Sequence, residues 1–350
     1  MKDPSWERSF AIREQTIGEG QPPFIIAEMA CAHNGDLDRA KSIVDAASNA
    51  RADAIQLQLF QTDHQFPPSH DLYKLLSDLE LGEHEWSDLF VYARRTSMAI
   101  FAFAYDPPSL RRALSFGIDA IKLSSADLSN PDMTRGAALS GLPVTLGTGA
   151  TTLHEIRQSL RYLQESGGRK VALMHGAQNF PTALEDADLR RIQLLRNEFQ
   201  LPVGYQDHTD AELEISKTID LVAMGMGACL IEKHITLSRA EKGTDYQAAL
   251  EPSEFEEFVK RIRLVSSALG SEREHPLRES DHQYRQFQKK SVVAISDIPK
   301  GDLITKDKLA YLRGFADQGI SPMDVPQIFD KAAARNIKKY SPIRRDDVVE

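Results

Sequence analysis

The sequence has few cysteines, no long apolar run and no excess of positive charge. Its 350 residues include only Cys31 and Cys229, too few for a disulfide framework, and both lie in apolar surroundings. The net charge of −9 argues against a general nucleic-acid binder, because neutralising phosphates needs a concentrated basic surface. No segment resembles a membrane span, and the N-terminal stretch lacks the apolar core of a signal peptide. We therefore expect buried thiols in a cytoplasmic protein that binds neither nucleic acid nor membrane.

Short apolar runs alternate with amphipathic stretches along most of the chain, which is typical of repeated strand–helix units around a parallel sheet. Eight such runs are present: FIIAEM, ADAIQL, MAIFAFAY, DAIKL, LPVTLG, KVALMH, LPVGYQ and ACLIEKH. No G-x-G-x-x-G follows the first run, which disfavours a doubly wound open sheet. Eight units in about 250 residues predict a closed (β/α)₈ TIM barrel.

The composition changes near residue 270. Residues 271–290 are charged, poor in aliphatic side chains and without periodicity, so they are interpreted as a linker. After them come short β-like runs broken by Pro299, Lys300 and Gly301, which predict a compact β-rich module. The predicted domains are a catalytic TIM barrel over 1–270, a linker over 271–290 and a small module over 291–350.

Local sequence patterns predict where two of the helices begin. Asp38 is the expected cap of a helix with apolar residues three and four apart, at Ala40, Ile43, Val44 and Ala47. The turn formed by Gly147, Thr148 and Gly149 precedes the helix TTLHEIRQSLRYL, whose free N–H groups could bind an anion. A tight turn needs glycine with or without a ligand, so the structural interpretation is preferred here.

The carboxyl ends of the strands build the active site of a TIM barrel. The residues that close the eight runs are unusually polar. They are Glu28, Gln56, Gln58, Lys122, Ser124, Ser125, Thr148, His175, Gln206, Asp207, His208, Glu232, Lys233 and His234, with Asp127 just beyond.

His208 and His234 close neighbouring runs. Adjacent strands lie about 4.8 Å apart, so two imidazoles at equal height can reach one metal ion. Two neutral imidazoles leave most coordination positions open, which suits a divalent ion that polarises a substrate oxygen. A histidine can instead bond only a loop carbonyl, and this is preferred for His175, which has no such partner.

Glu28 and Lys122 are expected in the same mouth. Glu28 could complete the coordination, act as an acid/base, or form a salt bridge to Lys122 or Lys233. Lys122 would be the main cation for an anionic substrate. It could instead form a Schiff base, so a class I aldolase is the rival enzyme, although the imidazole pair favours the metal route.

A series of motifs resembles the N-acetylneuraminate (sialic acid) synthase family. From about Phe24 to Leu269 it comprises IIAEMACAHNGD, ADAIQLQ, KLSSADLSNP, LGTGATTLHEI, NFPT, LPVGYQDHT, IEKHITL and AALEP. The segment SVVAISDIPKGDLITKDKLAYLRGFADQGISPMD resembles the family's C-terminal antifreeze-like (SAF) domain. The resemblance implies a transferase of carbohydrate biosynthesis that condenses phosphoenolpyruvate with an N-acylated amino sugar to give a 3-deoxy-2-keto acid.

The resemblance also implies roles for particular residues. His208 and His234 would hold the metal, most often Mn²⁺, with Mg²⁺ or Co²⁺ as alternatives. Glu28, Lys122 and Asp207 are the predicted catalytic residues. Arg313 would enter the partner subunit's site, which implies a domain-swapped homodimer. The other predicted substrate-binding residues are Gln56, Gln58, Ser125, Asp127, Gln178, Asn179, Phe180, Gln206 and Asp245.

The sequence departs from the family pattern at the expected donor site. The lysine of the family's KFQ pattern is Gln56, and the serine before Asp-His is Gln206. Ala102, Phe103 and Ala104 replace a Ser-Thr-Pro, Phe180 replaces a tyrosine, and Gln178 or Asn179 takes the place of an asparagine. Losing one lysine removes a charge-assisted contact worth about 1.5–3 kcal/mol. The alternatives are therefore an altered donor, a lyase-type reaction, or a non-catalytic binding homologue; retention of Glu28, Lys122 and both histidines disfavours the last.

Overall fold

The chain folds into a closed parallel barrel followed by a smaller unit. The computed structural model describes residues 6–270, 276–315 and 318–349. Its two compact units are Met1–Gly270 and Ser271–Glu350.

The barrel strands coincide with the eight apolar runs, so the predicted TIM barrel is confirmed. They are β3 (Phe24–Glu28), β4 (Ala54–Leu59), β5 (Ala99–Ala104), β6 (Ala120–Leu123), β7 (Val144–Gly147), β8 (Val171–His175), β9 (Val203–Asp207) and β10 (Leu230–His234). All neighbouring strands are parallel, and β10 pairs with β3 to close the ring.

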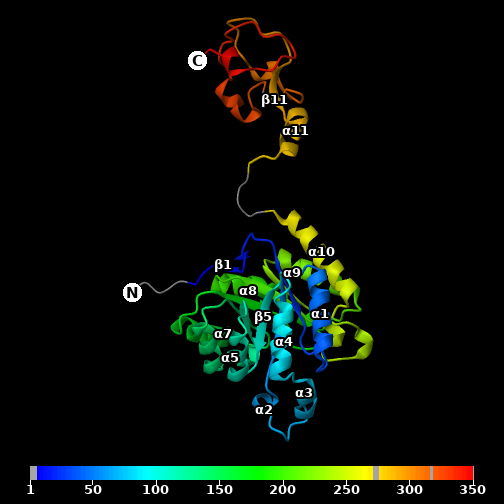
Figure 1. Cartoon of the computed structure of the whole chain (residues 1–350). Coiled ribbons are helices and arrows are strands. Elements are labelled where there is room, and N and C mark those ends of the chain that lie inside the picture. The colour runs from blue at the N-terminus through cyan, green and yellow to red at the C-terminus, as the bar shows by residue number, and fades with distance from the viewer. Residues whose placement is uncertain (1–5, 271–275, 316–317, 350) are drawn as a thin grey trace. The chain divides into compact units, whose positions relative to one another are not determined.

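Helices surround this barrel (Figure 1). They are α1 (Leu37–Asn49), α2 (Thr62–Gln65), α3 (Tyr73–Leu79), α4 (Glu83–Ala93), α5 (Pro107–Ser115), α6 (Pro131–Leu139), α7 (Leu153–Glu165), α8 (Arg190–Phe199), α9 (Ile219–Gly225) and α10 (Pro252–Leu269). Short 3₁₀ turns lie between them at η1 (Ser125–Asp127), η2 (Leu184–Asp186), η3 (Glu214–Lys217), η4 (Arg239–Glu241) and η5 (Tyr246–Ala248).

Helix α1 has the expected buried face but a different cap. Its buried residues are Ala40, Ile43, Val44 and Ala47. The side chain of Asp36, not that of Asp38, accepts the hydrogen bond from the Arg39 backbone N–H. The helix therefore begins earlier than expected, and Asp38 lies in its first turn, where a carboxylate also favours the helix dipole.

A short hairpin that the sequence analysis did not identify covers one end of the barrel. Strands β1 (Ser9–Ile12) and β2 (Gln15–Gly18) pair in antiparallel fashion. Phe10, Ile12 and Ile17 pack in one apolar cluster with Phe24 and Leu230, which begin their strands. The hairpin thus fills the amino-terminal end, and only the carboxyl-terminal end is left to hold a site. In Figure 1 the β1 label and the α2–α3 excursion lie at opposite ends of the barrel.

The strands alternate strictly between the inside and the outside of the barrel, as side chains on a strand must. In β10, Leu230 belongs to the inner cluster and Ile231 to the larger cluster between barrel and helices. Continuing this alternation, Glu232 and His234 point inward and Lys233 points outward. This parity decides which strand-end residues reach the barrel mouth.

The second unit contains α11 (Glu279–Gln288), β11 (Ser291–Ala294) and β12 (Leu309–Leu312), together with η6 (Lys306–Lys308), η7 (Pro322–Gln327) and η8 (Arg345–Asp347). Strands β11 and β12 are antiparallel. A small core of its own includes Val292, Ile298, Ile304 and Ile343. Helix α11 lies within the expected linker; it has no buried residue, which explains why no apolar periodicity marked it.

Both cysteines are buried free thiols, as expected. Among the described residues, no helix is long and apolar enough to cross a membrane.

Candidate active site

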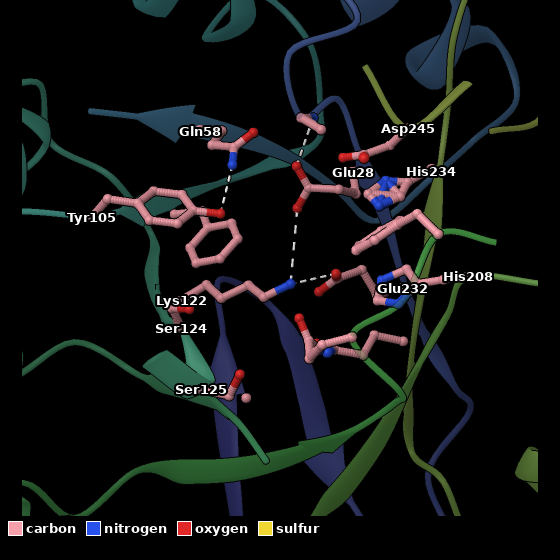
Figure 2. A pocket seen from close by; sticks show the side chains of 16 residues that line it. Glu28, Gln58, Tyr105, Lys122, Ser124, Ser125, His208, Glu232, His234 and Asp245 are labelled. Atoms are coloured by element: carbon pink, nitrogen blue, oxygen red, sulfur yellow. Dashed lines mark hydrogen bonds and ion pairs between the residues drawn. The ribbon is translucent and has the colours of Figure 1, made fainter. Parts of the chain in front are cut away.

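A cavity of about 150 Å³ opens at the carboxyl-terminal end of the barrel strands. This is smaller than the roughly 300–1,000 Å³ typical of pockets for drug-sized ligands, so the cavity suits small metabolites. Figure 2 shows the 16 side chains that line it. They are Glu28, Ala30, Gln58, Phe103, Tyr105, Lys122, Ser124, Ser125, Gly147, Gln178, Phe180, Gln206, His208, Glu232, His234 and Asp245.

The structure brings most of the predicted site residues together in this cavity. Those present are Glu28, Gln58, Lys122, Ser125, Gln178, Phe180, Gln206, His208, His234 and Asp245. Gln56, Asp127, Asn179 and Asp207 do not line it, and Arg313 is an exposed residue of the second unit.

His208 and His234 lie side by side because β9 and β10 are neighbours and both side chains point inward. Their ring centroids are 5.2 Å apart and their planes are inclined by 35°. The Phe180 ring packs against them, at 4.2 Å from the His208 centroid. Burial lowers the pKa of both histidines, so both rings are neutral near pH 7 and carry free lone pairs.

The nitrogen atoms of this pair fit a metal ion. His208 Nδ1 is 2.6 Å from the Ala177 carbonyl, so that nitrogen is the donor and Nε2 is left for a ligand. Both ring nitrogens of His234 are buried without a hydrogen-bond partner among the described residues. No group of three or more His, Cys, Asp or Glu side chains in the described chain is arranged to hold a metal. The protein would therefore supply two imidazoles and leave the other positions to water or substrate.

Glu28 is held deep in the cavity by its neighbours. One of its oxygens accepts from the Ala30 backbone N–H at 2.6 Å, and the other accepts from the side-chain amide of Gln56. Gln56 therefore lies beneath Glu28, fully buried, and supports it without lining the cavity. Burial raises the pKa of Glu28 to about 8, although Lys122 lowers it.

Lys122 is the one lysine of the cavity, and two carboxylates hold it. Its ammonium group forms an ion pair with Glu232 and lies 4.0 Å from Glu28 (Figure 2). It also lies 4.6 Å above the centre of the Phe103 ring. A Schiff base needs a free neutral amine, so these ion pairs argue against the class I aldolase route.

Asp207 and Lys233 face away from the cavity, so the structure does not bring Asp207 together with Glu28 and Lys122, the other predicted catalytic residues. Both are fully buried outside the barrel, where Lys233 pairs with Asp207 and with Asp220, the latter at 2.9 Å. Asp207 also accepts hydrogen bonds from Tyr205 and Thr209. It does not line the cavity, because it lies between two inward-facing residues and points to the other side of β9.

One wall of the cavity is aromatic. The Phe103 and Tyr105 rings are 4.4 Å apart, and the Tyr105 hydroxyl accepts a hydrogen bond from the Gln58 side-chain amide at 2.5 Å. Ser124 and Glu232 were expected at strand ends but were given no role, and Tyr105 was not predicted at all. Each lies at an inward position of its strand or just past its end, so counting every second residue from a known inward one would have found all three.

Asp245 reaches the cavity from the loop after β10. Its backbone has φ 57°, in the left-handed region, and its carboxylate has no hydrogen-bond partner among the described residues. Burial raises its pKa to about 6. A carboxylate without partners in a cavity is available to bind hydroxyl groups or to accept a proton.

The remaining predicted residues have structural partners. Asp127 accepts a hydrogen bond from Asn130 at 3.1 Å, and Asn179 donates one to Asp186 at 3.3 Å. His175 bonds the Ala187 carbonyl at 2.9 Å, as the structural interpretation of that residue expected.

The turn before α7 is held by hydrogen bonds within the chain. Thr152 and Glu155 form a capping box that engages their own backbone N–H groups at the helix start. Thr148 bonds the Met174 carbonyl through both its backbone N–H and its hydroxyl. These bonds fit the structural interpretation of this glycine-rich turn.

The fold and the cavity define a barrel enzyme whose chemistry lies at the carboxyl ends of its strands. The chain belongs to the NeuB family: the model of that family matches residues 43–274, and a SAF domain model matches residues 289–349.

Known proteins resemble this chain over most of its length. An uncharacterised protein of Methanocaldococcus jannaschii is 33% identical over 86% of this chain and 88% of its own. The N,N′-diacetyllegionaminic acid synthase of Legionella pneumophila is 31% identical, with coverage of 91% and 93%. A crystal structure of the N-acetylneuraminic acid (sialic acid) synthetase of Leptospira borgpetersenii in complex with citrate aligns with TM-score 0.74 at 29% identity, over 80% of this chain and 97% of that one. The chain is accordingly a carbon–carbon bond-forming synthase of carbohydrate biosynthesis.

Proposed function

We propose that this protein joins a three-carbon enol donor to the aldehyde of an N-acylated amino sugar and so forms a nonulosonic, sialic-acid-like 3-deoxy-2-keto acid. Phosphoenolpyruvate is the donor that the family resemblance implies, and Mn²⁺, or else Mg²⁺ or Co²⁺, is the implied ion. One observation carries the proposal: a single cavity holds a neutral imidazole pair, an ammonium group paired with Glu232, and the carboxyl groups of Glu28 and Asp245. The synthase names of the relatives support it.

The residues of the cavity have separable tasks in this scheme. A divalent ion held by His208 and His234 would polarise a substrate oxygen. The Lys122 ammonium group, which pairs with Glu232, would bind the carboxylate of the donor. Glu28, whose raised pKa keeps it protonated near pH 7, can give a proton to the aldehyde oxygen as the new bond forms. Asp245 accepts hydrogen bonds from the hydroxyls of the acceptor.

The direct test is a product assay on the purified protein. The protein would be incubated with Mn²⁺, phosphoenolpyruvate and a panel of N-acyl amino sugars, and both released phosphate and the coupled acid would be measured. A new acid with the summed carbon skeleton supports the proposal. Absence of any coupled product with every donor and acceptor would reject it.

The metal proposal predicts the behaviour of two histidine variants. His208→Ala and His234→Ala should each weaken Mn²⁺ binding at least 100-fold, since even partners of metal ligands commonly matter 10- to 100-fold. Calorimetric titration with Mn²⁺ measures this without any substrate. His175→Ala is the matched control, because His175 is also a buried strand-end histidine but lies outside the cavity. Equal Mn²⁺ affinity in all three variants would contradict the metal site.

We also propose a cytoplasmic, domain-swapped homodimer in which Arg313 of one subunit serves the site of the other, as the resemblance implies. Mixing inactive Arg313→Ala and His234→Ala proteins should then restore activity through exchange of subunits. No recovery in a mixture shown to exchange subunits would reject this arrangement.

A second candidate keeps the condensation and changes the donor. Two departures from the family pattern favour it. Gln56 replaces a family lysine, and its side-chain amide donates a hydrogen bond to Glu28. Phe103 replaces a small hydroxyl residue, and its ring lies beneath the Lys122 ammonium group. Gln206, another departure, places a longer side chain in the cavity.

A further inference from the structure

Three neighbouring strands place an amide, an aromatic ring and an ammonium group at the same height of the barrel mouth. Gln58 on β4 is paired with Phe103 on β5, and Phe103 is paired with Lys122 on β6. All three side chains line the cavity. Because residues paired across parallel strands lie beside one another, Phe103 stands between the amide and the ammonium group.

The Phe103 ring contacts the only lysine of the cavity. Among the described residues that line the cavity, Lys122 is the one lysine and none is an arginine. The Lys122 nitrogen lies 4.6 Å from the centre of the Phe103 ring. The negative face of an aromatic ring attracts an ammonium group within about 6 Å, and more strongly where water is excluded. Lys122 is only 4% exposed, so this attraction is hardly screened.

The ring is itself held in place by Tyr105. The centroids of the Phe103 and Tyr105 rings are 4.4 Å apart, and their planes are inclined by 33°. The Tyr105 hydroxyl accepts a hydrogen bond from the Gln58 side-chain amide, as Figure 2 shows. The Gln58 carbonyl oxygen accepts from the Cys31 thiol at 3.5 Å. These contacts hold the Phe103 ring against the ammonium group.

Without the ring, the ammonium group has a competing position. It forms an ion pair with Glu232 and lies 4.0 Å from Glu28, which is beyond the reach of a hydrogen bond (Figure 2). Lysine has a flexible four-carbon stem, so its nitrogen can move to close this gap. An ammonium group bonded to both carboxyl groups would be less available to a ligand. A neutral ring opposes that movement without adding a negative charge to the cavity.

We propose that Phe103 is a positioning residue for donor binding: its ring holds the Lys122 ammonium group away from Glu28 and keeps it open to the carboxylate of phosphoenolpyruvate. This inference rests on the proposed function, since it concerns the cation that would bind that donor. The sequence has the ring within the segment that replaces the family's Ser-Thr-Pro, and it has Gln56 where the family has a lysine. The position of the one remaining lysine therefore matters more in this chain.

A graded test replaces Phe103 in the full-length protein with phenylalanine that carries one, two or three fluorine atoms. Fluorine withdraws electrons from the face of the ring and weakens its attraction for a cation, while the size of the ring hardly changes. Calorimetric titration with phosphoenolpyruvate in the presence of Mn²⁺ measures the Kd. We expect the Kd to rise stepwise, to about tenfold with three fluorine atoms. A ring that matters only for packing would give no such graded change.

Phe90 is the matched control for the fluorine series. It is a buried phenylalanine of α4 that stacks on Phe116 at 4.7 Å and does not line the cavity. The same fluorinated residues at Phe90 should leave the Kd within about twofold of wild type. A Kd that stays constant or falls along the Phe103 series, or that changes equally in both series, would overturn the inference.

A second measurement follows the ammonium group itself and needs no donor. Phe103→Leu removes the aromatic face, and crystal structures of wild type and variant would be compared. We expect the Lys122 nitrogen to move within about 3 Å of the Glu28 carboxyl group in the variant. An ammonium group that stays in place would overturn the inference. If Phe103→Leu does not fold, the fluorine series decides by itself, because it leaves the shape of the ring intact.

The two measurements separate this inference from the proposed function. Phosphoenolpyruvate binding by wild type, with a constant Kd along the Phe103 series, overturns the inference and leaves the proposed function intact. A wild-type protein that neither binds phosphoenolpyruvate nor forms any coupled product rejects the proposed function. Movement of the Lys122 nitrogen in Phe103→Leu would even then support the positioning of this lysine by the ring.

Discussion

The carboxyl group of Asp245 shows how one side chain is set by its surroundings. It lies partly buried in the cavity, and burial alone raises its pKa to about 6 from the ordinary 3.8. Below pH 4 the group is neutral in the folded and unfolded protein alike. As the pH rises through 4 to 6, the unfolded chain ionises first, so the folded state loses relative stability. Above pH 6 this loss is complete.

Asp245→Asn should therefore stabilise the protein at pH 7.5 relative to pH 4.5. We expect a pH-dependent gain of roughly 1–2 kcal/mol, from about 1.4 kcal/mol per pKa unit, because part of the loss has already occurred at pH 4.5 and partial exposure reduces the rest. Asparagine also tolerates the left-handed backbone, so the fold is kept. Thermal unfolding of wild type and variant at the two pH values measures the difference.

Asp71→Asn is the control, because Asp71 is exposed in the loop before α3. It should show no such pH-dependent gain. The same gain in both variants, or none in Asp245→Asn, would contradict the pKa shift.

A buried ion cluster on the outer face of the barrel connects strands β9 and β10. Lys233 on β10 pairs with Asp207 on β9 and with Asp220 on α9, and it bonds the Ser216 carbonyl at 3.1 Å. His208 and His234 directly follow the two bonded strand residues. The buried ion cluster therefore holds the two strand ends at equal height, which the imidazole pair requires.

Lys233→Met should destabilise the protein by about 3–5 kcal/mol, because it leaves two buried carboxyl groups without their cation. Urea unfolding measures this. In Lys217→Met the lost partner is Glu214, an exposed residue on the same turn, so the expected cost is about 0–1 kcal/mol. An equal loss in free energy of unfolding for the two variants would show that the buried cluster contributes no more to stability than an exposed ion pair.

The chain as a whole consists of two units with separate cores. The core of the second unit contains Ile298 and Ile304, and neither belongs to the clusters of the barrel. Each unit therefore has core packing of its own.

Matched core truncations should reveal this independence. Ile298→Ala and Ile262→Ala each remove a buried side chain, one from each unit, and should each cost about 2–5 kcal/mol. Scanning calorimetry of the full chain should show that each variant lowers a different unfolding transition. A single transition lowered equally by both would contradict two independent units.

Much of the fold could be read from local patterns. The eight apolar runs predicted all eight barrel strands, and polar strand ends located the mouth. The β1–β2 hairpin escaped because half of its strand residues are exposed and it forms no continuous apolar run, and α11 escaped because it buries none. Asp38 was taken as a cap since any aspartate near a helix start is suitable, and only the backbone geometry selects Asp36.

By itself the sequence determined the type and order of the elements, because periodicity and capping act between residues close in the chain. It also determined which polar residues end the strands. Only the tertiary structure decided which of them meet. Lys122 and Glu232 are 110 residues apart in the chain and form an ion pair, while Asp207 turns outward between two inward neighbours. Closure of the barrel decides which strand-end residues meet, because it brings distant strands into register and places each side chain on the inner or the outer face.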